Sequence, residues 1–165
     1  MRRTILAPLQ AVTPQLSPNE QSPVSALSVF SDETWDFSTE TADTSRPLSK
    51  QAIRWKFKLT QERDSLAPEH ASMLLALKQL AYLMLFGATR MKPISVVDRI
   101  MMLKIFIRFL AERQSPIFRF QDVLQFHIKE YLDYLRTRPG RRGAIQSAVL
   151  RNHLTALNLG CVPPV

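Results

Sequence analysis

The chain has 165 residues, of which 45% are hydrophobic, a length that fits one ordinary domain with an appendage. Its formal charge of +8 comes from residues 49–165, where nineteen basic and eight acidic side chains leave a surplus that favours an anionic partner. The single cysteine, Cys161, excludes a disulfide framework, and charged residues inside the longest apolar stretches exclude a membrane span, so we expect a cytoplasmic protein.

The first 48 residues are predicted to be mostly disordered. They contain five prolines among Ser, Thr and Gln and have no sustained hydrophobic period, so they offer little apolar surface to offset the loss of chain entropy. The exception is Thr34–Ser38, where Trp35 and Phe37 alternate with polar residues as in a short strand.

A second strand is predicted at Ala52–Thr60. Its apolar side chains alternate with cations, which is the period of a half-buried strand. The two segments together predict a short β-ribbon. The alternative is a platform on which single-stranded nucleic acid stacks, but aromatic and cationic residues fall on opposite faces, which favours ordinary strand packing.

Helical spacing then predicts two long helices. The first covers Pro68–Phe86, with Gly87 suited to its C-terminal cap. The second covers Ser95–Gln114, and the Ser95–Asp98 pair is typical of a capping motif at a helix start. Because apolar residues surround almost the whole second helix, we expect it to be central in the bundle.

Two further helices and a basic turn follow. A third helix is predicted over about Asp122–Thr137 and a fourth over about Ala144–Leu157, separated by a turn with Pro139 and Gly140. The fold class is therefore mainly α. The expected division is a disordered segment 1–48, a strand and linker 49–64, a helical domain 65–160 and a tail 161–165.

The turn contains the best candidate binding residues. Four arginines before a helix are able to meet successive phosphates of a nucleic acid, although a solvated loop has the same composition. We also expect Arg151 and Asn152, on the outward face of the fourth helix, to reach base edges. The candidate DNA-binding residues are Arg136, Arg138, Arg141, Arg142, Arg151, Asn152, Lys104 and Arg108. For Lys104 and Arg108 a solvent-facing position without a ligand is an equal alternative.

Catalysis and metal binding are not expected. Tyr131 and Tyr134 fit the apolar pattern of the third helix and have no predicted set of cationic donors around them. His70, His127 and His153 are far apart and have no partner at ligand spacing, so we expect surface or half-buried histidines and no cofactor.

Three patterns together resemble a known family. Leu103, Phe106 and Leu110 with Glu112 are similar to one family helix, Asp122 and the Tyr131–Leu135 run to the next, and Leu150–Leu157 to a third. This order resembles the core-binding, SAM-like helical domain that precedes the catalytic domain of tyrosine recombinases and phage integrases.

The resemblance implies a four-helix SAM-like bundle that holds one face of duplex DNA. In the family, catalysis belongs to a second domain whose arginine, histidine and tyrosine motifs are missing here, so we expect no enzyme activity. A recombinase catalytic domain or other protomers are further expected partners. Two alternatives stay open: an all-helical protein-protein interaction module, and a non-functional remnant of an integrase gene.

Overall fold

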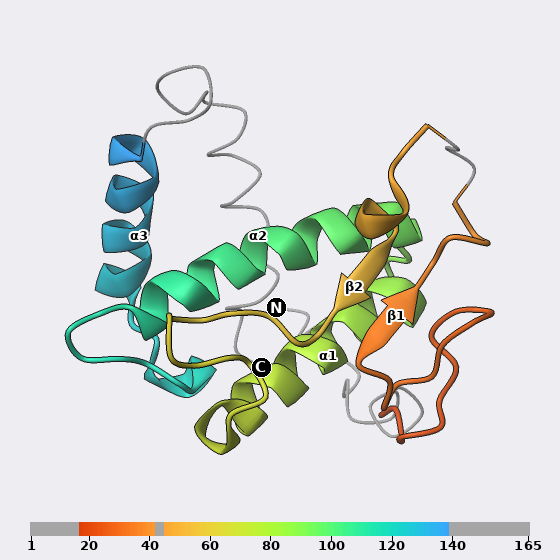
Figure 1. The fold of residues 1–165 in the computed structure, drawn as a ribbon, viewed down its shortest axis with the longest axis horizontal. Helices are drawn as coiled ribbons and strands as arrows, with labels where there is room; N and C mark the ends of the chain where they lie inside the picture. Colours follow the sequence, from red (N-terminus) through yellow and green to blue (C-terminus); the bar gives the residue numbers. More distant parts are fainter. Residues whose placement is uncertain (1–16, 42–44, 139–165) are drawn as a thin grey trace, which may run out of the picture.

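The computed structural model describes residues 17–41 and 45–138, in which helices dominate and one small sheet is present (Figure 1). The mainly α fold class is thereby confirmed. The fourth helix, expected over Ala144–Leu157, lies outside the described residues, so the four-helix SAM-like bundle stays a prediction. The elements are β1 (Thr34–Asp36), β2 (Ala52–Arg54), α1 (Ala71–Phe86), α2 (Pro93–Ala111) and α3 (Gln125–Thr137).

The two strands form an antiparallel ribbon. Trp35 pairs with Ile53, and the outer pairs are Thr34 with Arg54 and Asp36 with Ala52. The predicted β-ribbon is confirmed, although β2 is shorter than the Ala52–Thr60 segment that the alternation indicated. Beyond Arg54 the chain runs along α2 towards the C-terminal end of that helix (Figure 1).

The apolar face of the ribbon lies in the core of the protein. Trp35, Phe37, Ile53 and Trp55 are each at most 1% exposed, and the two indole rings meet edge to face with centroids 4.7 Å apart. Arg54 and Lys56 lie on the other side and are exposed. Alternation of aromatic and cationic residues is therefore explained by packing, because the rings are too deeply buried to stack with a base.

Most of the described N-terminal segment is ordered, so the predicted disorder is wrong for residues 17–33 and 39–41. Val24 and Phe30 are buried with the aromatic residues of the ribbon. Backbone hydrogen bonds fold the segment back on itself, among them one from Phe30 N–H to the Ser22 carbonyl at 2.9 Å. The short-range pattern missed this order because the stabilising contacts come from helices far along the chain. Residues 1–16 lie outside the described part.

One hydrophobic core crosses the expected domain boundaries. The cluster of buried side chains extends from Val24 to Leu135 and includes residues of the ribbon and of all three described helices. The expected divisions at residues 48 and 65 are therefore not divisions of the core. In the described part, ribbon and helices fold against each other.

A short 3-10 turn, Pro68–His70, leads into α1, and Gly87 ends it as predicted. The Gly87 N–H donates to the Leu83 carbonyl at 2.8 Å. A Cβ at position 87 would collide with that same carbonyl oxygen. The φ of Gly87 is −74°, which any residue can adopt, so backbone conformation does not require glycine here. Glycine is needed because the backbone approaches the Leu83 carbonyl too closely for a Cβ.

The start of α2 differs from the predicted one. The helix begins at Pro93 and has no side-chain hydrogen bond at its cap, so the expected Ser95–Asp98 capping motif is wrong. The Asp98 carboxylate instead accepts hydrogen bonds from Arg46 at 3.1 Å. The expected central position of α2 is borne out by nine buried residues, which face the ribbon, α1 and α3.

α3 lies across the C-terminal end of α2 (Figure 1). Its first turn is closed by His127, whose Nδ1 accepts a hydrogen bond from the Leu124 N–H at 2.8 Å. Tyr131 then packs against Phe106 of α2, with ring centroids 4.9 Å apart. His127 is only 6% exposed, so the expectation of a surface or half-buried histidine is wrong at this position.

Candidate nucleic-acid interface

Two of the four predicted phosphate-binding arginines are described, and both are exposed at the C-terminal end of α3. The Arg136 guanidinium pairs with Asp133 one turn earlier at 2.8 Å, in a pair that is well exposed on both sides. Arg138 caps the helix, and its N–H donates to the Tyr134 carbonyl at 3.0 Å. Arg141 and Arg142 come after Pro139 and Gly140 in the sequence and lie outside the described residues, as do Arg151 and Asn152.

The local sequence explains this exposure. Tyr131 and Leu135 occupy the buried face of α3, which leaves Asp133 and Arg136 on the solvent face. Basic side chains also complement the partial negative charge of a helix C-terminus. The side chain of Arg138 makes no ion pair with the described residues, so no described acid competes with an anionic ligand for its guanidinium.

Lys104 is not part of this surface, and its prediction as a DNA-binding residue is wrong. Its side chain is buried in α2, and the Nζ donates a hydrogen bond to the Arg54 carbonyl. The ammonium lies 4.9 Å from the centre of the Phe57 ring and 5.9 Å from that of Trp55. Burial, with the nearby cations Arg108 and Arg54, lowers the pKa of Lys104 to about 8.

Arg108 is exposed one turn further along α2, as the DNA-binding prediction requires. Its Nε donates to the Lys58 carbonyl at 2.8 Å, and the guanidinium lies 5.8 Å from the centre of the Phe57 ring. Arg108 therefore has two functions available to it: the Nε fixes the segment after β2, while the terminal nitrogens remain able to bind a ligand.

A further lysine that the sequence pattern did not single out holds the N-terminal segment. The Nζ of Lys78, on α1, donates to the carbonyls of Phe30, Ser31 and Asp32 at 3.0–3.3 Å. Partial burial lowers the pKa of Lys78, against the opposing effect of nearby acids. The available signal was a lone cation beside Leu77 in an otherwise apolar stretch.

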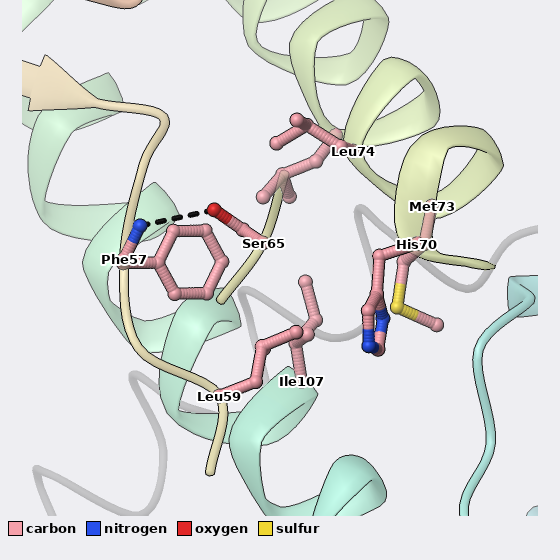
Figure 2. Close-up of a pocket in the computed structure, with 8 residues that line it drawn as sticks. Phe57, Leu59, Ser65, His70, Met73, Leu74 and Ile107 are labelled. Atoms are coloured by element: carbon pink, nitrogen blue, oxygen red, sulfur yellow. Dashed lines mark hydrogen bonds between the residues drawn. The ribbon is translucent and has the colours of Figure 1, made fainter. Parts of the chain in front are cut away.

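His70 lies beside a small cavity of about 10 Å³ between α1 and the segment that follows β2 (Figure 2). It is 2% exposed, so the expected surface or half-buried position is wrong, and neither ring nitrogen has a hydrogen-bond partner in the described part of the chain. Burial lowers its pKa. Since the cavity has room for about one water molecule, it is too small for a substrate.

The two tyrosines of α3 pack against aromatic residues of α2. Tyr131 is fully buried, and this burial raises the pKa of its phenol well above the usual range. Tyr134 packs on Phe109, with ring centroids 5.2 Å apart. Among residues 17–41 and 45–138, no group of three or more His, Cys, Asp or Glu side chains is arranged to hold a metal ion.

Comparisons with known proteins found no match: no family model, no curated protein and no solved structure matches this chain. In the described part of the chain, none of the helices has the length and apolar character needed to cross a bilayer.

Proposed function

We propose that this chain is a non-catalytic duplex-DNA-binding domain, of the kind that precedes the catalytic domain in tyrosine recombinases and phage integrases. The observation that supports it best is the exposure of Arg136 and Arg138 at the end of α3, in a chain with a net charge of +8. Arg141 and Arg142 come shortly after them in the sequence, so four guanidinium groups lie within seven residues.

The chemistry of arginine suits a phosphate backbone. The planar guanidinium presents two parallel N–H donors to two phosphate oxygens and stays charged at any physiological pH. Contacts of this kind give affinity and fix the register of a protein on DNA, and base contacts then add specificity. Arg151 and Asn152 remain the candidates for base contacts, and Arg108 is a further candidate for the backbone.

The residues that carry the resemblance to the recombinase family lie in the contact between α2 and α3. Phe106 and Leu110 of α2, together with Tyr131 and Leu135 of α3, are all at most 1% exposed. The two patterns therefore serve to dock one helix on the other, and this docking fixes the position of the exposed arginines. The same residues would be core in any helical bundle, so the proposed DNA binding depends on the charges rather than on this packing.

Binding of a labelled duplex tests the proposal. The chain with Arg136, Arg138, Arg141 and Arg142 replaced by glutamine is expected to bind at least tenfold more weakly, with a shallower dependence on salt. An unchanged far-ultraviolet circular dichroism spectrum would establish that the variant is folded. Equal affinity of the two chains would overturn the assignment of the arginine cluster.

A second candidate function is protein-protein interaction through the outer face of α3. Leu124 and Phe126 are 55% and 50% exposed, and Phe126 lines a shallow groove of about 470 Å³ with Gln125, Ile128, Lys129 and Leu132. Exposed apolar side chains in a row are typical of a contact surface. Sedimentation of the chain with and without a Phe126→Ser substitution tests whether this face joins two copies, and a monomer at all concentrations would exclude self-association.

A further inference from the structure

The segment that begins with β2 presents a row of three cations to solvent. Arg54, Lys56 and Lys58 are exposed, whereas Ile53, Trp55 and Leu59 are at most 2% exposed. The inward residues thus determine which side chains point outward. The three charges therefore lie on the solvent side of β2 and of the segment that follows it.

The backbone of this row is held in place from both sides. From α2, Lys104 donates to the Arg54 carbonyl and Arg108 to the Lys58 carbonyl. From the other side, the Trp55 N–H donates to the Glu33 carbonyl at 2.8 Å and the Phe57 N–H to the Ser65 hydroxyl at 2.9 Å (Figure 2). The cations are thereby mounted on a fixed backbone, which reduces the entropy lost when they bind.

The row is not neutralised by the acids around it. None of its three cations forms an ion pair with a described residue. Asp64 lies opposite Lys58 in an isolated β-bridge, but its Oδ1 accepts from the Leu66 N–H at 2.9 Å. Glu33 and Asp36 are the other acids at the ribbon, and neither forms an ion pair with a described residue. The Asp36 Oδ1 accepts from the Ser38 N–H at 2.8 Å. Three exposed cations without ion-pair partners among the described residues, on a backbone held by hydrogen bonds, form a surface suited to a polyanion.

We propose that Arg54, Lys56 and Lys58, with Arg108 at the end of the row, form a second phosphate-binding surface for a duplex DNA backbone. A duplex backbone presents a closely spaced series of phosphates, so several cations on one surface are able to contact it at the same time. The inference rests on the proposed function for its ligand. It adds β2 and the segment that follows it to the proposed DNA-contacting surface, which otherwise consists of the arginine cluster at the end of α3.

The test compares two variants of equal charge. The row variant carries Arg54→Gln, Lys56→Gln and Lys58→Gln. The control variant carries Arg90→Gln, Lys92→Gln and Arg119→Gln, which removes three exposed cations from other places. Because the total charge is the same, any difference between them comes from the position of the cations. Equal urea midpoints would establish that both variants are folded.

Affinity for a short fluorescein-labelled duplex is measured across a salt series of about 50–200 mM. The row variant is expected to lose about tenfold in affinity and to reduce the log–log salt slope by about two to three, since each contact contributes about 0.9 to that slope. The control variant is expected to change the slope by less than about one. Asp64→Asn, which keeps the oxygen that accepts from Leu66, is expected to strengthen binding.

The outcomes separate this inference from the proposed function. If the unaltered chain binds and both variants behave alike, the row is overturned while DNA binding stands. If the row variant alone loses its salt slope, the row is supported, even where the arginine cluster variant binds normally. If the unaltered chain fails to bind the duplex at low salt, both the row and the proposed function are overturned.

Discussion

Trp35 and Trp55, one from β1 and one from the residue after β2, meet edge to face with ring centroids 4.7 Å apart and with almost no exposed surface. Two lysine ammonium groups lie within 6 Å of the centre of the Trp55 ring, Lys78 from α1 at 5.7 Å and Lys104 from α2 at 5.9 Å. The ribbon is therefore joined to both long helices at one aromatic cluster.

The two indoles are expected to differ in their tolerance of phenylalanine. The Trp35 Nε1 donates to the Phe30 carbonyl at 3.3 Å, whereas the Trp55 Nε1 is buried without an acceptor among the described residues. Trp35→Phe should therefore lower the free energy of unfolding by about 1 kcal/mol more than Trp55→Phe, because only the former loses a hydrogen bond. Urea denaturation measures the difference. The exposed Leu48→Ala serves as a control, with an expected change below about 0.5 kcal/mol. A larger loss of unfolding free energy in Trp55→Phe than in Trp35→Phe would contradict the stabilising role of the Trp35 hydrogen bond.

Lys104 should make the stability of the protein rise with pH on the alkaline side. Burial lowers the pKa of this amine to about 8, against 10.5 when it is free in water. Between these two values the unfolded chain binds more protons than the folded chain, so raising the pH favours the folded state. From about pH 8 to 9.5 the free energy of unfolding should increase by about 1–2 kcal/mol from this residue.

The comparison is with Lys104→Met, which keeps the aliphatic stem but cannot titrate. Lys78 also has a lowered pKa and contributes in the same direction, so the relevant quantity is the difference between the two chains. Parallel pH profiles of the free energy of unfolding for the unaltered chain and Lys104→Met would show that Lys104 does not titrate as expected. A direct nuclear magnetic resonance titration of the Lys104 side chain gives the pKa even if the variant fails to fold.

His70 should make the protein less stable in weak acid. Its pKa is lowered by burial, so below the free value of 6.5 the unfolded chain takes up a proton that the folded chain resists. The stability that His70 contributes is present above about pH 6.5 and is lost as the pH falls below it. We expect His70→Phe to flatten the decline in urea midpoint between about pH 7.5 and 5.5, a range in which few carboxylates titrate. An equal decline in both chains would assign the acid sensitivity to other groups.

Of the two described arginines at the end of α3, Arg138 should matter more for DNA. Arg136 is already paired with Asp133 at 2.8 Å, and the side chain of Arg138 has no ion-pair partner in the described part. Arg138→Ala should therefore weaken duplex binding more than Arg136→Ala, while Asp133→Asn should strengthen it by releasing Arg136. Fluorescence anisotropy with a labelled duplex measures all three. If Arg136→Ala weakens duplex binding more than Arg138→Ala, Asp133 positions Arg136 for DNA rather than competing with DNA for it.

Local patterns predicted the ribbon and the described helices well. The alternation around Trp35 and Trp55 indicated two strands, and the strands pair as expected. The apolar circumference of α2 indicated a central helix, and α2 is buried on several sides. These features depend on short-range periodicity, which a sequence displays directly.

The position of the cations was harder to predict, because it depends on tertiary contacts. Lys104 and Arg108 are one helical turn apart, yet one is buried and the other is exposed. Lys104 lies beneath the end of β2, where its Nζ donates to the Arg54 carbonyl beside the Trp55 and Phe57 rings, whereas Arg108 lies beside the segment after β2 and donates to the Lys58 carbonyl from an exposed position. Likewise, order in residues 17–41 depends on Lys78 and on burial of Phe30, contacts that span more than forty residues.

The salt dependence of duplex binding by the unaltered 165-residue protein tests most directly whether this chain holds DNA by its phosphates. Four arginine contacts alone predict a log–log slope of about −3.6, and the cationic row would make it steeper. A steep, linear loss of affinity with salt is the result that we expect. Binding that does not change with salt, or no binding at low salt, would contradict the account.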